Sequence, residues 1–331
     1  MQGQICQGWD RDSTFGGVRD PALLSRRPCP TLCAVMPVRW TMRRLMLSSL
    51  PAVAAAALLI PALVSTLAPT AADAATLERI EASGTVRLGF REDARPYSFK
   101  DSAGKPAGYI VDLCRDVVER LKPGARKLKT EFVRIAPSER FEAVREGRID
   151  ILCDPASVTM ERRAIVDFSI PTFLDGTSVL YRADRPVHAF EDLAGRRIAV
   201  LGGTTTADNL RLGMRQVGVN AQVTEVADHR EGLRLLTTDK IDAYFGDRAI
   251  LAALLYQGPM PGIELSRRYF SYETYALALP RGDDAFRLAV DRALAELYRS
   301  GRVRHLLTRT FGERRDDMLD ALIVINSFPE R

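Results

Sequence analysis

Short apolar strands and amphipathic helices alternate along the chain from residue 76 onward. Apolar residues recur at helical spacing in Thr76–Gly84 and in 109–121, and the short apolar run Val86–Phe90 lies between these two segments. The same reading predicts further strands within 127–135, 149–154, 192–203, 221–226 and 241–247, and helices at 137–147, 205–218, 229–239 and 284–301. This alternation is typical of an α/β fold with parallel strands.

Two segments of the chain follow the same plan, which predicts two lobes. The stretch "EGRIDILCD" matches "TDKIDAYFGD": each passes from a helix end through Ile-Asp into a short strand that ends in aspartate. The extended segments Gly176–Pro186 and "SYETYALALPRGD" flank the second block, so we expect the chain to cross into lobe 2 and return. Lobe 1 would comprise 75–180 and 275–331, lobe 2 would comprise 181–274, and the crossings would act as hinges.

The N-terminal 74 residues do not show this alternation. Residues 42–74 carry a basic start, a mostly apolar run from Leu45 to Ala68 and the small-residue site Ala72-Asp73-Ala74, the order of a secretory signal peptide cleaved before Ala75. An uncleaved membrane anchor is the alternative, because the run approaches the length of a span. Residues 1–41 are turn-rich and aperiodic, which suggests an over-long gene start or a disordered leader.

Composition narrows the class of protein. The chain has 331 residues, 46% hydrophobic and 27% charged, with a net charge of +5, as in ordinary globular proteins of about two domains. No long Lys/Arg block with interleaved aromatics is present, so nucleic-acid binding has little support. The three histidines lack metal-ligand spacing, and we expect neither a metal nor a cofactor.

Two cysteines, Cys114 and Cys153, remain after the expected cleavage. An even number of cysteines in an exported protein suggests a disulfide. Two separate buried thiols are the alternative.

Unusual polar residues cluster where the predicted strands end. Arg91 follows the strand Val86–Phe90 and precedes an aromatic turn that contains Tyr97. Ligands of α/β sheets lie beyond the carboxyl ends of strands, so this arginine is either a cation delivered to a ligand or a plain solvated loop residue.

Two later segments add groups suited to a carboxylate. Ser157 and Arg162 follow the strand within 149–154, and their hydroxyl and guanidinium groups suit an anion. Thr204 and Thr205 follow a Gly-Gly pair and open a helix, whose free amides face outward. The plain reading of each segment is a capped helix start, with Arg162 on a solvated face.

Two further polar residues are less specific by themselves. Asp247 ends the strand within 241–247, where its carboxylate suits an ammonium group, although aspartate is common in turns. His229 starts a predicted helix and could equally be a cap or a surface residue.

The order and spacing of these segments resemble the periplasmic solute-binding proteins of polar amino-acid ABC transporters, family 3. The similarity extends from about Thr76 to Gly312 and is carried by "RIEASGTVRLGF", "RPYSF", "GKPAGYIVDL", "SVTMERRAIVDFSIPTF", "EDLAGRRIAVLGGTTT", "IDAYFGD" and "LAELYRSG…FG". The resemblance implies a two-lobed α/β fold of the type II periplasmic-binding-protein class, with an amino acid held between lobes joined by two hinge strands. It also implies a monomeric, non-enzymatic periplasmic protein that delivers its ligand to a membrane permease.

The same resemblance implies a role for each candidate residue. Arg162, with Ser157, Thr205 and the amides near Thr205, would bind the ligand α-carboxylate. Asp247 would pair with the α-ammonium, and Tyr97 would pack over the ligand. A zwitterion that loses its water needs both partners, because an unpaired buried charge costs several kcal/mol.

Within the family, "GFRED…PYSF", "C…SVTMER" and "ADHREGLRLL" look most like the subgroup that binds glutamate and aspartate. That similarity assigns Arg91 and His229 to the side-chain carboxylate of the ligand. Pro155 departs from the subgroup, in which a hydroxyl residue is common at this position.

Two alternatives stay open at this point. One is a binding protein for a neutral or polar amino acid. The other is a periplasmic enzyme on the same fold, similar to cyclohexadienyl dehydratase, for which Glu92, Asp154 and His229 are the nearby acid and base candidates.

Overall fold

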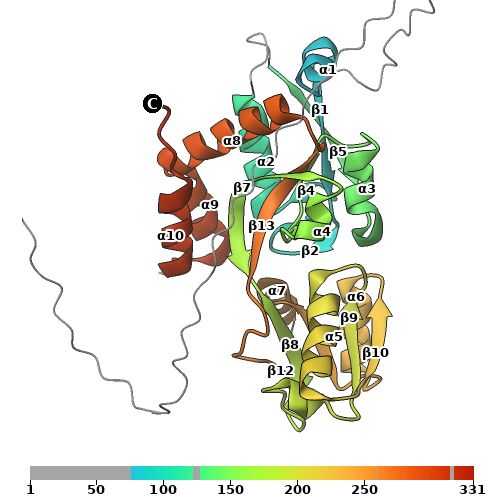
Figure 1. The fold of residues 1–331 in the computed structure, drawn as a ribbon. Coiled ribbons are helices and arrows are strands. Elements are labelled where there is room, and N and C mark those ends of the chain that lie inside the picture. The colour runs from blue at the N-terminus through green and yellow to red at the C-terminus, as the bar shows by residue number, and fades with distance from the viewer. Residues whose placement is uncertain (1–75, 122–126, 259, 314–316) are drawn as a thin grey trace, which may run out of the picture. The chain divides into compact units, whose positions relative to one another are not determined.

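A computed structural model describes residues 76–121, 127–258, 260–313 and 317–331 (Figure 1). All of them belong to one unit of the chain, Thr66–Arg331. The predicted leader, signal peptide and cleavage site lie outside the described residues. No helix in the described ranges combines the length and the apolar character that a membrane crossing needs.

The first of two five-stranded sheets defines lobe 1. Strand β1 pairs in parallel with β5 and β6, whereas β13 runs antiparallel to β6 and β7. In sheet order the strands are β5 (Lys129–Arg134), β1 (Thr85–Phe90), β6 (Ile151–Leu152), β13 (Glu273–Leu279) and β7 (Asp167–Asp175). The predicted alternation of strands and helices around a parallel core is confirmed.

The second five-stranded sheet defines lobe 2. Strand β9 pairs in parallel with β10 and β11, and β8 runs antiparallel to β11 and β12. In sheet order the strands are β10 (Gln222–Val226), β9 (Arg197–Leu201), β11 (Ala243–Asp247), β8 (Thr177–Arg182) and β12 (Ile263–Leu265). The two sheets repeat one plan, in which a parallel core is completed by antiparallel strands.

A small third sheet follows β1 directly and carries the aromatic turn. Its strands are β2 (Asp93–Ala94), β3 (Ser98–Lys100) and β4 (Pro106–Ala107). This short sheet lies between the end of β1 and the start of the next helix, so it brings the turn back to the strand end.

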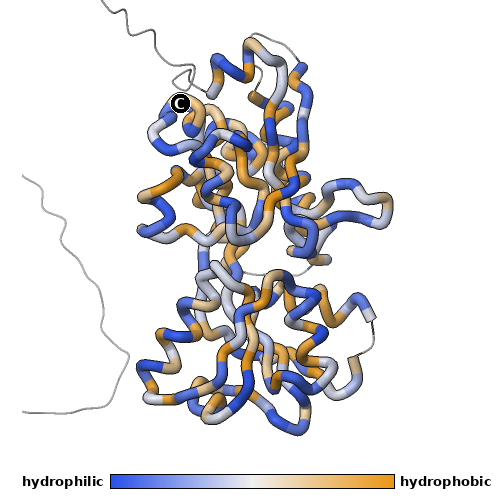
Figure 2. Tube along the Cα trace, turned by 90° about the vertical axis from the view of Figure 1, so that its right-hand side faces the viewer, coloured by the Kyte–Doolittle hydropathy of each residue, from blue (hydrophilic) through white to orange (hydrophobic). Residues whose placement is uncertain are grey.

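Helices pack on both sheets through apolar faces. Figure 2 shows hydrophobic positions gathered along the strands and the inward sides of the helices. Leu88 on β1 and Ile110 and Leu113 on α2 are fully buried in one core cluster. The α-helices are α1 (Thr76–Ser83), α2 (Tyr109–Arg120), α3 (Arg140–Arg145), α4 (Met160–Arg163), α5 (Thr205–Val217), α6 (His229–Thr237), α7 (Arg248–Tyr256), α8 (Asp284–Arg299), α9 (Arg302–Phe311) and α10 (Asp317–Asn326), and 3-10 turns span Pro137–Glu139 and Phe190–Leu193.

Two adjacent segments carry the chain between the lobes. Strand β7 continues through Gly176 into β8, and the returning β13 pairs Glu273 with Asp175 beside it (Figure 1). A Cβ at Gly176 would lie 1.9 Å from the carbonyl oxygen of Ser271, so only glycine permits this close approach. The sequence did not predict β7, and the predicted lobe boundary at residue 180 falls inside β8; we propose Gly176 and Ser271 as the crossing points.

A disulfide joins the two cysteines singled out from the sequence. Cys114 on α2 is bonded to Cys153, which follows β6 directly. The predicted disulfide is therefore confirmed, and it fixes the end of the strand from which several candidate site residues continue.

Candidate functional site

A small enclosed cavity of about 20 Å³ lies among the residues that follow the strand ends of both lobes, large enough for one water molecule. Six of the eight ligand-binding residues predicted from the sequence line it. The lining residues are Arg91, Arg140, Pro155, Ser157, Leu201, Thr204, Thr205, Thr206, His229, Phe245, Gly246 and Asp247. The strand ends of both sheets therefore converge on one site, as expected for this class of fold.

Arg91 is held rigidly at the end of β1. Its side chain is only 4% exposed, its backbone N–H donates to Ser98 Oγ at 3.0 Å, and its Nε and NH2 groups donate to Asp93 Oδ1 at 3.0 and 2.8 Å. Burial lowers the pKa of Arg91, but the carboxylates of Asp154 and Asp93 outweigh it and raise the pKa above its ordinary value. The guanidinium is thus a permanent cation at the cavity.

Arg140, on α3, is a second buried cation that sequence reasoning missed. One guanidinium nitrogen donates to the carbonyl oxygen of Pro137 and another to that of Gly203 in lobe 2, the latter at 3.2 Å. Its Nε lies 3.5 Å from Asp154 Oδ2. Burial lowers the pKa of Arg140 to about 10, so it stays charged at neutral pH.

His229 begins α6 and faces these arginines from lobe 2. Its backbone N–H donates to Asp93 Oδ2 at 3.1 Å, and its Nδ1 lies 2.8 Å from the hydroxyl of Tyr244. Burial, and then the charge of Arg91, lower the pKa of His229 to about 4. The imidazole is therefore neutral at pH 7 and can offer Nε2 to a ligand.

Asp247 supplies a carboxyl group to the cavity from the end of β11. It accepts a hydrogen bond from Thr206 Oγ1 at 3.3 Å. Enclosure by the protein, and then the nearby carboxylates of Asp175 and Glu273, raise the pKa of Asp247 to about 8. A cationic group placed beside it would favour the ionised form.

The start of α5 adds donors on the lobe 2 side. Thr204 caps the helix: its hydroxyl donates to the carbonyl oxygen of Leu201 at 2.7 Å and accepts from the Ala207 N–H at 3.3 Å. The helix runs 13 residues, so its N-terminal amides and dipole favour an anion here.

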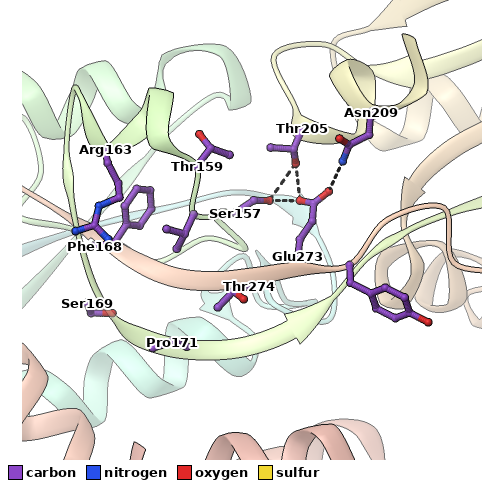
Figure 3. A pocket seen from close by; sticks show the side chains of 12 residues that line it. Ser157, Thr159, Arg163, Phe168, Ser169, Pro171, Thr205, Asn209, Glu273 and Thr274 are labelled. Carbon is purple, nitrogen blue, oxygen red and sulfur yellow. Dashed lines mark hydrogen bonds between the residues drawn. The ribbon is translucent and has the colours of Figure 1, made fainter. Parts of the chain in front are cut away.

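Ser157 and Thr205 connect the two lobes. Their hydroxyl oxygens lie 3.0 Å apart, and both donate to Glu273 Oε2, at 2.6 Å in the case of Thr205 (Figure 3). Asn209 and Ser271 donate to Glu273 Oε1 at 3.0 and 3.1 Å. Sequence reasoning treated Glu273 only as part of an extended segment.

A larger hollow of about 550 Å³ adjoins this cluster, and Ser157 and Thr205 line both cavities (Figure 3). Arg163 at its edge is exposed, and the hollow lacks the buried arginines and the opposed carboxyl group of the smaller cavity. The chemistry of the smaller cavity therefore matches a zwitterion better, and its volume of about 20 Å³ would have to widen through lobe opening to admit an amino acid.

Two predicted residues do not line the small cavity. Arg162 is buried, donates to the carbonyl oxygen of Ser157 at 2.9 Å and stacks 4.8 Å from the Phe141 ring, so it is not on a solvated face. Tyr97 is fully buried, and its hydroxyl donates to Asp175 Oδ2 at 2.8 Å. Their ligand contacts stay predictions.

The acid and base candidates of the enzyme alternative are dispersed. Glu92 pairs with Lys100 and, at 2.8 Å, with Arg134, and it does not line the cavity. Asp154 lies behind Arg91, and only His229 of the three lines the cavity.

Comparison with known proteins agrees with this geometry. Residues 86–313 match the family of bacterial extracellular solute-binding proteins, family 3. An L-glutamate/L-aspartate-binding protein of Pseudomonas aeruginosa is 31% identical over 265 residues, covering 78% of this chain and 88% of its own.

Two solved structures are similar in fold and sequence. An ancestral arginine-binding protein bound to glutamine has a TM-score of 0.64 and 28% identity, with 70% of this chain and 99% of that one covered. An ancestral amino acid-binding protein, a precursor of cyclohexadienyl dehydratase, has a TM-score of 0.64 and 26% identity over 71% of this chain and 99% of its own. The fold is thus the two-lobed type II periplasmic-binding-protein fold, and the chain belongs to the bacterial extracellular solute-binding proteins of family 3.

Proposed function

We propose that this protein binds one free amino acid between its lobes in the periplasm and delivers it to the permease of an ABC transporter. The observation that carries the proposal is the convergence of buried arginines and the carboxyl group of Asp247 on one cavity. A free amino acid carries a carboxylate for the arginines and an ammonium group that would ionise Asp247, and closing the lobes around it would remove it from water.

The α-carboxylate and α-ammonium groups of the ligand each have matching polar groups around the cavity. The N-terminus of α5 with Thr204 and Thr205, together with Ser157 and the charge of Arg162 behind it, suits the α-carboxylate. Asp247 suits the α-ammonium. Its carboxyl group has a pKa of about 8 in the ligand-free protein, and a nearby ammonium group would stabilise its ionised form.

The side-chain end of the site favours glutamate or aspartate. Arg91 and Arg140 present two buried guanidiniums, and His229 offers an Nε2 that has no hydrogen-bond partner among the described residues. The similar Pseudomonas protein is named for the same two ligands, which supports this preference.

We propose a non-enzymatic role, since the acid and base candidates are not arranged as a pair at the cavity. We likewise propose that residues 42–74 are a cleaved signal peptide and that the protein acts as a monomer. The similar Pseudomonas protein is a binding protein by name, and the family is one of extracellular solute-binding proteins by description.

A ligand panel tests the proposal directly. The protein purified from the periplasm, stripped of ligand by unfolding and refolding, is screened by thermal shift with the twenty amino acids, and positives are titrated by calorimetry. A ligand that binds only the folded state raises the midpoint. We expect glutamate and aspartate among the positives, and no binding of any amino acid would refute the proposal. Incubation with prephenate-like cyclic acids gives turnover only if the enzyme alternative holds.

A further inference from the structure

Asp154 is a buried carboxylate placed directly beside the two cavity arginines. It follows Cys153, whose disulfide with Cys114 fixes the backbone, and only 1% of its surface is exposed. Its Oδ1 lies 3.9 Å from Arg91 Nε and its Oδ2 lies 3.5 Å from Arg140 Nε. The carboxylate therefore bridges the cations that a ligand side chain would meet.

The position of Asp154 is costly for the fold. Neither of its oxygens has a hydrogen-bond partner in the described part of the chain, and Arg140 Nε also has none. Burial raises the pKa of the Asp154 carboxyl even though both arginines oppose the shift. A buried polar atom without a partner is destabilising, so this carboxylate contributes through charge rather than through hydrogen bonds.

The contacts around Arg91 and Arg140 give the net charge of the cavity end that would meet the ligand side chain. Arg91 and Arg140 provide two positive charges, Asp93 and Asp154 provide two negative charges, and His229 is neutral. The side-chain end is therefore neutral before any ligand arrives. A ligand carboxylate would bring an uncompensated charge out of water, whereas a carboxamide would bring none.

We infer that Asp154 sets ligand specificity by neutralising Arg91 and Arg140, so that the site accepts a carboxamide side chain, as in glutamine or asparagine, with an affinity within about tenfold of that for a carboxylate. Asp154 acts through the two arginines and does not itself line the cavity. The inference rests on the proposed function and extends its ligand class from acidic amino acids to their amides.

The experiment measures the ratio of the dissociation constants of glutamine and glutamate by calorimetry at pH 7, for wild type and for Asp154→Asn. In wild type we expect glutamine to bind no more than about tenfold more weakly than glutamate. In Asp154→Asn the arginines lose one counter-charge, so the ratio should move at least tenfold toward glutamate, while glutamine affinity changes by less than about threefold.

Asp150→Asn is the matched control. Asp150 is also 1% exposed and also contacts two arginines, Arg79 at 2.5 Å and Arg87 at 2.7 Å, but it precedes β6 and lies outside the cavity. Its replacement should leave the ratio unchanged, because a general loss of stability weakens both ligands alike.

Each outcome decides one question. A wild-type preference for glutamate above tenfold, or an unchanged ratio in Asp154→Asn, overturns the inference. If the variant does not fold, the wild-type ratio alone decides. Failure of every amino acid to bind refutes the proposed function instead, and the two failures are therefore distinguishable.

Discussion

The hydroxyl oxygens of Ser157 in lobe 1 and Thr205 in lobe 2 lie 3.0 Å apart, and Glu273 on the returning strand β13 accepts from both. One carboxylate on a hinge strand thus connects the two lobes at the point where two cavities meet. Hinge-bending proteins change the distance between such residues when they open. The strength of this cluster should therefore set part of the free energy of closure.

Replacing Glu273 with alanine should weaken amino-acid binding without changing specificity. Charge-assisted hydrogen bonds contribute about 1.5–3 kcal/mol, so we expect an affinity loss of roughly tenfold or more for every ligand. Calorimetry with glutamate and glutamine measures this, and equal losses are expected because Glu273 does not touch the side-chain end.

Glu264→Ala is the control for that substitution. Glu264 is also a carboxylate that accepts from a hydroxyl, that of Tyr181 at 3.3 Å, but it lines neither of the two cavities. Unchanged affinity in Glu273→Ala, or a loss confined to one ligand, would contradict the role of the cluster in closure.

Arg140→Met should weaken glutamate far more than it weakens a neutral amino acid. Its loss leaves Asp93 and Asp154 facing Arg91 alone, so the side-chain end becomes negative and repels a carboxylate. Losing one member of a buried charge pair costs about 3 kcal/mol, or roughly a hundredfold in affinity. Leucine, which brings no side-chain charge, should lose less than about tenfold.

The matched control for Arg140 is Arg134→Met. Arg134 is exposed and pairs with Glu92 outside the cavity, so its removal should leave both affinities unchanged. Equal losses of glutamate and leucine in Arg140→Met would show that Arg140 only supports the fold.

The sequence predicts site residues where a strand ends and fails where tertiary packing decides. Arg91 directly follows the apolar strand β1 and Asp247 is the last residue of the apolar strand β11, so their side chains are delivered to the cavity by local structure. Arg140 lies on a helix, and its burial depends on how α3 packs and on Gly203 of the other lobe. Nothing in its local sequence distinguishes it from Arg145, the exposed arginine of the same helix.

The missed strand β7 and the placement of Tyr97 have the same physical origin. Pro171 interrupts the residue pattern of β7, and the strand forms because β13, distant in sequence, pairs with it. The ring of Tyr97 packs 5.1 Å from Phe173 and 5.6 Å from Tyr275, contacts that also come from distant segments. A single sequence carries no direct record of such pairings.

The stability of the ligand-free protein should fall as the pH rises from 6.5 to 8. The pKa of Asp247 is about 8 in the folded protein and near its ordinary value when unfolded, so the native state holds a proton that the unfolded state lacks. His229, whose pKa is about 4 when folded and 6.5 when unfolded, raises stability with pH only up to the lower end of this window, and Asp175, with a pKa of about 6, acts mainly below it. Raising the pH removes the native proton, and stability should drop by on the order of 1 kcal/mol.

Thermal and urea unfolding of wild type and Asp247→Asn measure this effect. The variant should lose the slope between pH 6.5 and 8, whereas Asp242→Asn should keep it, because the pKa of Asp242 is about 2. A wild-type stability that is flat or rising across the window would contradict the assignment. Calorimetry in two buffers of different ionisation enthalpy should also show proton release when an amino acid binds.

The disulfide should stabilise the folded chain by constraining the unfolded state. Cys114 and Cys153 are 39 residues apart, and closing a loop of that length is worth about 4 kcal/mol in the chain-entropy account. Urea unfolding of the Cys114→Ala, Cys153→Ala double variant should show this loss, and reducing the wild type should reproduce it. Titration of the mature, denatured, unreduced protein should find no free thiol. A free energy of unfolding for the double variant within about 1 kcal/mol of the wild-type value would contradict this account. Packing of α2 against the sheet, rather than the covalent link, would then hold the end of β6, from which Asp154 and Ser157 continue.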